Sequence, residues 1–152
     1  MTASRAGEDR VIGRHVYGSL YGIPANLAGD EGYLRDLVLR AVESSGATLL
    51  DLRSWKVPGK KGGVSVIAVV LESHIALHTW VEYRYATVDA YTCGDSADPW
   101  KAWETILEGL KPEYYTVHYA DRSQLPQRAP HSPEGRAVGT APSQPRGPRP
   151  RL

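Results

Sequence analysis

The segment VVLESHIALHTW, residues 69 to 80, places polar side chains that can do chemistry inside an otherwise apolar strand. The strand is interrupted at Glu72, Ser73 and His74 and then resumes with a second histidine, His78. A buried polar group without a partner costs about 1–3 kcal/mol, so such an interruption indicates a function.

Two other kinds of site can be built from the same residues. On a helix, His74 and His78 would share a face and could bind one metal ion. On a strand they also share a face but lie about 13 Å apart at ~3.3 Å per residue, too far for one ion, so we expect no metal site. A hydrolase triad of Ser73, His78 and Asp89 is possible in kind, but no Gly-x-Ser-x-Gly turn surrounds the serine.

Cys93 is the only cysteine and stands before a glycine in YTCGD. A lone cysteine is either a small buried apolar residue or a functional thiol, and its position leaves both interpretations open. With one cysteine no intrachain disulfide can form, so a reducing cytoplasm is the expected setting. We find neither a signal-peptide pattern nor an apolar stretch near the roughly 18 residues of a membrane span.

The elements that must position these residues alternate along the chain. Apolar spacing predicts a helix from Asp30 to Gly46, and a second helix that starts at Asp98-Pro99 with an N-cap and a proline in first position. We write the order as β-α-β-β-β-α-β, an α+β two-layer sandwich in which two helices cover one face of an antiparallel sheet. Strand patterns, rich in β-branched and aromatic residues, cover residues 11–23, 48–57, 64–71, 73–80, 84–92 and 114–120.

Residues 122–152 differ in composition from the rest. They hold six Arg, one Glu and seven of the eleven prolines, a formal charge of +5, whereas residues 1–121 carry −4. The tail has too few large apolar residues to offset the entropy of ordering, so we expect it to be disordered, and residues 1–10 to be flexible. The domain is then expected over residues 11–121. The overall charge of +1 gives no indication of nucleic-acid or membrane binding.

The stretch GGVSVIAVVLESHIALHTWVEYRYATVDAYTCG, residues 62 to 94, resembles the core of the prokaryotic S-adenosylmethionine decarboxylases, a family of pyruvoyl-dependent enzymes. The resemblance extends more loosely over residues 11–123 and leaves out the basic tail. It rests on several fixed spacings, at Ser65, Glu72-Ser73-His74, His78-Thr79-Trp80, Glu82 and Thr92-Cys93-Gly94.

The resemblance implies that the chain cleaves itself between Glu72 and Ser73. The Ser73 hydroxyl would attack the Glu72 carbonyl and turn the amide into an ester. Elimination and hydrolysis would then leave a β chain of residues 1–72 and an α chain that starts with a pyruvoyl group made from Ser73. This group would form a Schiff base with the substrate and take up the electrons left when carbon dioxide departs, so no external cofactor is needed.

The resemblance also implies roles for three further residues. His78 would accept a proton in the elimination step with the help of Ser65, and Cys93 would return a proton to the α-carbon of the substrate. Strand alternation places Ser73 and His78 on opposite faces, so we predict an irregularity between residues 72 and 78. The family builds its sites at the interface of paired αβ units, which implies a homo-oligomer of processed protomers.

The substrate is expected to be a small molecule of the amino-acid class, selected by the pocket around its side chain. Trp55 stands where the family has an adenine-stacking aromatic residue, but a longer KVPGKKGG loop follows it, and residue 81 is Val where proline is usual. With HVYGSLYG and YADRS, these features resemble the branch that converts L-arginine to agmatine in polyamine biosynthesis; S-adenosylmethionine is the alternative substrate. A guanidinium needs a carboxylate partner, and Glu82 and Asp89 are candidates, although each could equally be a solvated or salt-bridged acid.

An alternative from another class is a non-catalytic domain whose Arg/Pro-rich tail binds an acidic partner. The complete Glu-Ser-His, His and Cys set argues against it, because a binding module does not need these residues at these spacings. Denaturing electrophoresis separates the two, since a catalytic member runs as two fragments and an inert domain as one.

Overall fold

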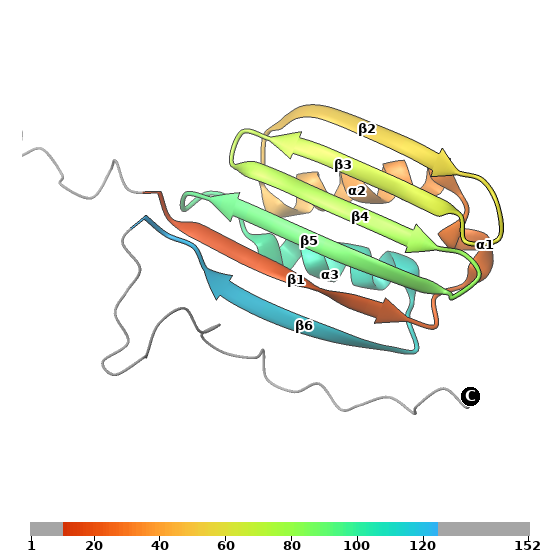
Figure 1. Cartoon of the computed structure of the whole chain (residues 1–152). Coiled ribbons are helices and arrows are strands. Elements are labelled where there is room, and N and C mark those ends of the chain that lie inside the picture. Colours follow the sequence, from red (N-terminus) through yellow and green to blue (C-terminus); the bar gives the residue numbers. More distant parts are fainter. Residues whose placement is uncertain (1–10, 125–152) are drawn as a thin grey trace, which may run out of the picture.

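The described part of the chain, residues 11–124 of this computed structural model, is built on a six-stranded sheet of order β2-β3-β4-β5-β1-β6 (Figure 1). All neighbouring strands are antiparallel, and this confirms the α+β two-layer sandwich. In chain order the elements are β1 (Gly13–Tyr21), α1 (Ala25–Ala28), α2 (Glu31–Ser45), β2 (Leu49–Val57), β3 (Gly63–Val70), β4 (Ser73–Trp80), β5 (Tyr85–Cys93), α3 (Pro99–Leu110) and β6 (Tyr114–Asp121).

The written order β-α-β-β-β-α-β is one strand short, although the six strand patterns of the sequence, 64–71 and 73–80 among them, correspond to β1 to β6. VVLESHIALHTW is not one interrupted strand, because the chain reverses at Leu71 and Glu72, and Val70 pairs with Ser73 across the turn. Four strands therefore separate the two long helices. The single-turn helix α1 was not predicted either, since four residues are too few to show a helical repeat.

Local capping signals set the ends of both long helices, as predicted. The Asp30 side chain accepts a hydrogen bond of 3.0 Å from the Tyr33 N–H at the start of α2. Gly46 ends that helix with a φ of 77°, a left-handed conformation that glycine adopts without strain. Asp98 caps α3 in the same way, accepting from the Trp100 N–H at 2.9 Å. Each N-cap stabilises its helix by about 1 kcal/mol.

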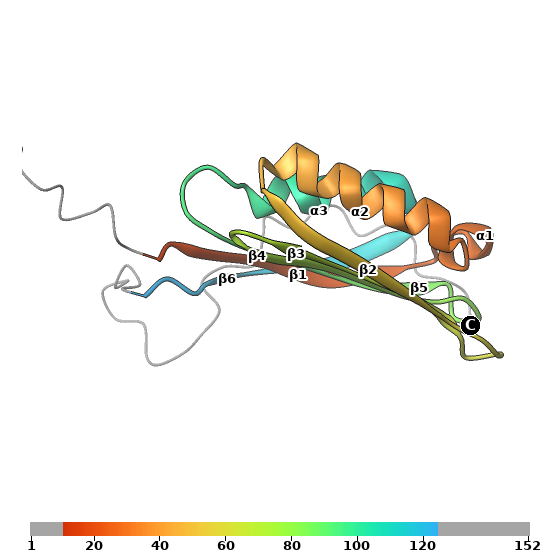
Figure 2. The same cartoon turned by 90° about the horizontal axis from the view of Figure 1, so that it is seen from above.

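Both long helices pack on the same face of the sheet, and the opposite face carries none of the described helices (Figure 2). Alternate strand residues point toward the helices, and the buried ones come from the four inner strands, because the edge strands β2 and β6 have no buried residue. Large side chains that are fully buried there include Val16 and Leu20 of β1, Leu34, Leu37 and Val38 of α2, Val66 of β3, Ile75 and Leu77 of β4, and Ile106 and Leu110 of α3.

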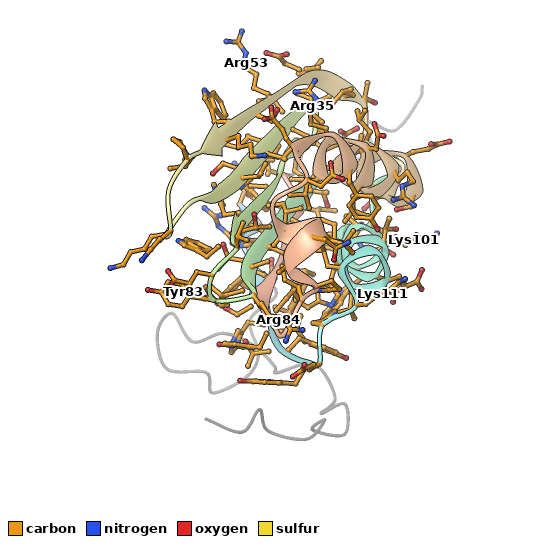
Figure 3. All side chains as sticks on the ribbon, turned by 90° about the vertical axis from the view of Figure 1, so that its right-hand side faces the viewer. Arg35, Arg53, Tyr83, Arg84, Lys101 and Lys111 are labelled. Carbon is orange, nitrogen blue, oxygen red and sulfur yellow. The ribbon has the colours of Figure 1, made fainter. Side chains whose placement is uncertain are left out.

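Polar contacts at the edges of the molecule connect the helix layer and the loop after β1 to the sheet. Arg35 of α2 donates to the Ser54 Oγ on edge strand β2 at 2.8 Å, and Ser54 in turn donates to Glu31 at 2.7 Å (Figure 3). At the β4–β5 turn, Arg84 donates to the carbonyl of Ile23 at 2.8 Å and to that of Gly22 at 3.0 Å (Figure 3). The Arg84 contacts fix the loop between β1 and α1 against the β4–β5 turn.

Gly63 marks a close approach of β3 to β4. A Cβ there would lie 1.7 Å from the Thr79 carbonyl oxygen, so the two strands would have to separate. We expect Gly63→Ala to lower the free energy of unfolding by about 2–3 kcal/mol. The control is Gly32→Ala in α2, where the added Cβ would lie 3.6 Å from the nearest atom. This substitution should be neutral or stabilising by about 0.5–1 kcal/mol. Urea unfolding in a chain kept intact by Ser73→Ala tests this, and equal stabilities would contradict it.

Ordered pairing continues three residues past the expected domain boundary at 121. The Arg122 N–H donates to the Gly13 carbonyl at 2.8 Å, and the Gln124 N–H donates to the Val11 carbonyl at 3.0 Å. The expectations for residues 1–10 and 125–152 lie outside the described residues. Within residues 11–124, none of the helices has the length and apolar character required to cross a membrane.

Candidate active site

The open face of the sheet carries most of the side chains that the sequence predicts to be functional. Pairing register arranges them in rows across the strands. One row contains Trp55, Ser65, His78, Thr87, Ser19 and Thr116. A second row contains His74, Tyr91 and His15. Four residues of β4 separate the two rows, which is about 13 Å along the strand.

The first row contains the pair expected to act in elimination. The Ser65 Oγ and the His78 Nδ1 are 2.8 Å apart, because the two residues are direct partners in the β3–β4 ladder. Ser73 is not part of this contact. It lies five residues from His78 on β4, about 17 Å along the strand, so one chain does not bring the two together.

An irregularity lies at Ser73, inside the expected span of residues 72 to 78, but it does not bring Ser73 and His78 of one chain together. The φ of Ser73 is 151°, in a region that residues other than glycine enter only with strain of about 1–3 kcal/mol. From His74 to Trp80 the strand pairs in regular register with both neighbours. The strain is therefore confined to the residue that follows the predicted scissile bond, at the end of the two-residue turn.

Cys93 lies beside that bond. Its backbone N–H donates to the Glu72 carbonyl at 2.8 Å, and its thiol is free and half-buried. The Glu72 carboxylate accepts from the Thr48 N–H at 3.0 Å, which fixes the other side of the turn. Arg14 donates to the Ala97 carbonyl in the loop after Cys93 and thereby restrains that loop.

A chain of hydrogen bonds leads away from Ser73 across three strands. The Ser73 Oγ lies 3.1 Å from the His74 Nδ1, and the His74 Nε2 lies 3.1 Å from the Asp89 Oδ1. The His15 Nε2 reaches the same carboxylate oxygen at 2.8 Å. Burial alone would raise the pKa of Asp89, but the hydrogen bonds from His74 and His15 outweigh it, and the pKa lies below its ordinary value.

Replacing Asp89 by asparagine should remove a pH-dependent part of the stability. The lowered pKa means that the ionised carboxylate favours the folded state above the ordinary pKa of 3.8, and that this contribution is lost as the pH falls from 3.8 through the folded pKa. In the Ser73→Ala background, we expect Asp89→Asn to be more destabilising at about pH 7 than at about pH 3. Urea unfolding at both pH values measures this, and an equal effect at both would contradict it.

From the sequence, His74 is indicated only as a candidate metal ligand and as a member of the Glu72-Ser73-His74 motif, and His15 is not indicated as a site residue. The signal for both lies in strand register, because His15, His74 and Asp89 come from β1, β4 and β5 and meet only when these strands are aligned. Over residues 11–124, we find no group of three or more His, Cys, Asp or Glu side chains arranged to hold a metal ion.

The three expected substrate contacts are spread over the open face. Asp89 and His78 line one depression of about 500 Å³ between the two rows, together with Tyr17 and Ala76. Trp55 is 52% exposed on β2, directly opposite Ser65. Glu82 is exposed in the turn after β4, at the end of that strand farthest from Ser73. Within one chain, Glu82 and Trp55 therefore lie near the Ser65–His78 end and not near Ser73.

The remaining motif residue, Thr79, has a structural position. It is buried, and its hydroxyl donates to the Ala28 carbonyl at 2.5 Å and accepts from the Val64 N–H at 3.0 Å. These bonds attach α1 to the sheet beside His78.

Comparisons with known proteins agree with the motif. The S-adenosylmethionine decarboxylase family matches residues 14–123. The chain is 65% identical over 117 residues to the arginine decarboxylase proenzyme of Aeropyrum pernix, which covers 77% of this chain and 89% of that protein. Proenzymes of the same name from Hyperthermus butylicus and Ignicoccus hospitalis are 55% identical over 121 residues and 56% identical over 133 residues. These matches cover 80% and 87% of this chain, and 85% and 88% of the two proteins.

The fold has a solved counterpart. The crystal structure of the adenosylmethionine decarboxylase from Aquifex aeolicus superposes with a TM-score of 0.69 and 27% sequence identity, over 80% of this chain and 99% of that one. The family match covers nearly all of the described residues, and three relatives share more than half of the aligned positions. This chain belongs to the S-adenosylmethionine decarboxylase family.

Proposed function

We propose that this chain is a self-processing, pyruvoyl-dependent arginine decarboxylase that converts L-arginine to agmatine and carbon dioxide. The observation that carries the proposal is the geometry at the Glu72–Ser73 bond. The bond follows a tight turn, Ser73 is strained, and the Glu72 carbonyl accepts a hydrogen bond from the Cys93 N–H. With a strained Ser73 and a hydrogen-bonded Glu72 carbonyl, this peptide bond is suited to attack by the Ser73 hydroxyl.

The Cys93 N–H has a definite role in this processing. Attack of the Ser73 hydroxyl on the Glu72 carbonyl places negative charge on the carbonyl oxygen, and a donor held at 2.8 Å stabilises that charge as it develops. His78 and Ser65 then serve the elimination step, and the residue that remains of Ser73 is the pyruvoyl group. The group supplies an electron sink for decarboxylation without an external cofactor.

Cys93 is the proposed proton donor in catalysis. Cys93 lies next in the sheet to the residue that becomes the pyruvoyl group, since Ser73 pairs with Thr92, its neighbour on β5. A thiol at this place can protonate the α-carbon of the substrate after carbon dioxide departs. A free thiol that must stay reduced for this purpose also supports a reducing cytoplasm as the compartment.

A second copy of the chain completes the site. Ser73 and Cys93 lie at one end of β4 and β5, and Ser65 and His78 lie toward the other end, about 17 Å along β4 from Ser73. A two-fold axis through the open face brings the first end of one protomer to the second end of its partner. This arrangement explains both why the face has no helix over it and why one chain separates residues that act on one bond.

Arginine is favoured over S-adenosylmethionine by two observations. The three relatives named arginine decarboxylase proenzyme are 55% to 65% identical, whereas the structure named adenosylmethionine decarboxylase is 27% identical. Asp89 already accepts hydrogen bonds from two histidines, so Glu82 of the second copy is the better carboxylate for a guanidinium. Trp55 lies at the same end of the face and can pack against the substrate side chain.

An intact-mass spectrum followed by carbon dioxide release tests the proposal. We expect two chains that divide at Glu72 and Ser73, with residue 73 as pyruvoyl, and faster release from labelled L-arginine than from labelled S-adenosylmethionine. Two chains with the opposite preference would make the protein an S-adenosylmethionine decarboxylase. A single chain inactive on both substrates would contradict the proposal and favour a non-catalytic domain.

A further inference from the structure

We infer that His74 is the base that removes the hydroxyl proton of Ser73 in ester formation, the first step of processing. The inference rests on the proposed function and adds to it, because His78 is the expected base for the later elimination and ester formation has no assigned base. Each of the two histidines of β4 then serves one step.

The two histidines of β4 have different hydrogen-bond partners, which indicates a different role for each. The His74 Nδ1 lies 3.1 Å from the Ser73 Oγ, within hydrogen-bond distance of the nucleophile. The His78 Nδ1 is engaged by the Ser65 Oγ at 2.8 Å. Along the strand His78 is about 17 Å from Ser73 in the same chain. Within one chain, His74 is therefore the histidine that contacts the reacting oxygen before cleavage.

Asp89 fixes the tautomer that this role needs. An ionised carboxylate can only accept, so the His74 Nε2 at 3.1 Å carries the hydrogen and donates it. The Nδ1 then carries the lone pair and faces the Ser73 hydroxyl. This is the order of roles in a serine, histidine and aspartate triad, where the carboxylate orients the imidazole and stabilises its protonated form.

His15 holds that carboxylate in place. Its Nε2 donates to the same oxygen of Asp89 at 2.8 Å, and its side chain is only 14% exposed. The Tyr91 ring lies between the two histidines, with its centroid 5.6 Å from that of His15 and 5.8 Å from that of His74. Asp89 and His15 are accordingly positioning residues, which act through His74.

The step balances as an acyl transfer from nitrogen to oxygen. The His74 Nδ1 takes the proton of the Ser73 hydroxyl, and the Oγ forms a bond to the Glu72 carbonyl carbon. The bond from that carbon to the Ser73 nitrogen then breaks. The proton on His74 passes to the departing nitrogen, which becomes a free amine, and His74 is neutral again at the end.

Hydroxylamine distinguishes the two steps, because it cleaves an ester and leaves an amide intact. We expect freshly purified His78→Ala chains to hold the ester and to be cut by neutral hydroxylamine, giving a hydroxamate at Glu72 and an unmodified Ser73 at the new N-terminus. We expect His74→Ala chains to resist hydroxylamine and to process at least about 100-fold more slowly than the wild type. Intact mass reports both results.

Controls separate chemistry from folding. His118→Ala removes an exposed histidine of β6 and should leave ester formation unchanged. Imidazole added to His74→Ala should restore processing, because a small base can occupy the vacated space, and a loss caused only by misfolding would not be restored. Asp89→Asn should slow ester formation less than His74→Ala does, and imidazole should not restore it, because its own histidine is still present.

The outcomes also separate this inference from the proposed function. If the wild type never processes, the proposed function fails. If the wild type processes and His74→Ala does so at the same rate, or accumulates a hydroxylamine-sensitive ester, His74 is not the base for ester formation and the proposed function stands.

Discussion

Replacing Ser73 by alanine should leave the protein as a single chain of 16.7 kDa with no decarboxylase activity. The substitution removes the only oxygen that can attack the Glu72 carbonyl from the next residue, and it also removes the atoms from which the pyruvoyl group is made. Both processing and catalysis are therefore lost together. Intact mass and carbon dioxide release measure the two losses.

Ser96→Ala provides the matched control. Ser96 is exposed in the loop between β5 and α3, and its replacement should give two chains and normal activity. Two chains from Ser73→Ala would mean that the break lies elsewhere. Activity from an uncut Ser73→Ala chain would mean that decarboxylation does not depend on a pyruvoyl group.

Mixing two inactive variants should restore processing. Ser73→Ala has no nucleophile, and His78→Ala lacks the base for elimination. In the proposed dimer, however, the Ser73 of one chain would meet the His78 of the other, because the two ends of β4 that form the site would come from different protomers. Random pairing of equal amounts should let about half of the His78→Ala chains complete cleavage. Co-expression with two affinity tags and intact mass measure the fraction.

The same mixture made with His74→Ala should give no rescue. Ser73 and His74 are neighbours in one chain, with 3.1 Å between the hydroxyl and the ring nitrogen, so an intact His74 on the partner cannot replace the missing one. If mixed dimers form and His78→Ala chains remain uncut, His78 acts within its own chain. Complementation therefore separates a residue that works across the interface from one that works beside the nucleophile.

Much of the fold is predictable because its signals are local. Asp30, Gly46 and Asp98 mark helix ends through the conformation and hydrogen bonding of single residues, and the structure confirms all three. The turn at Leu71 and Glu72 carries no such signal. Two-residue hairpin turns usually contain Asn-Gly or another glycine pair, and neither residue is of that kind. The sequence therefore separates residues 64–71 from 73–80 without indicating that the chain reverses between them.

The candidate site likewise has a part that is predictable from local sequence and a part that is not. The motif around Ser73 and His78 is contiguous, so the sequence alone indicates it. The contact between His74 and Asp89 depends on the alignment of β4 with β5, and that with His15 on the further alignment of β1. Alternation gives the face on which each residue lies but does not say which residues meet across strands, because that is fixed by the packing of the whole sheet.

A cut between β3 and β4 leaves two interleaved fragments. The first fragment supplies β1, β2 and β3, and the second supplies β4, β5 and β6, yet β1 lies between β5 and β6 in the sheet. Neither fragment has a complete sheet, and unfolding of the cut protein becomes the dissociation of two chains under mass action. The uncut chain refolds as one molecule, whereas the cut one must find its partner fragment. Processing thus replaces the reversible folding of one chain by the association of two fragments. The protein therefore has to fold first and be cut afterwards.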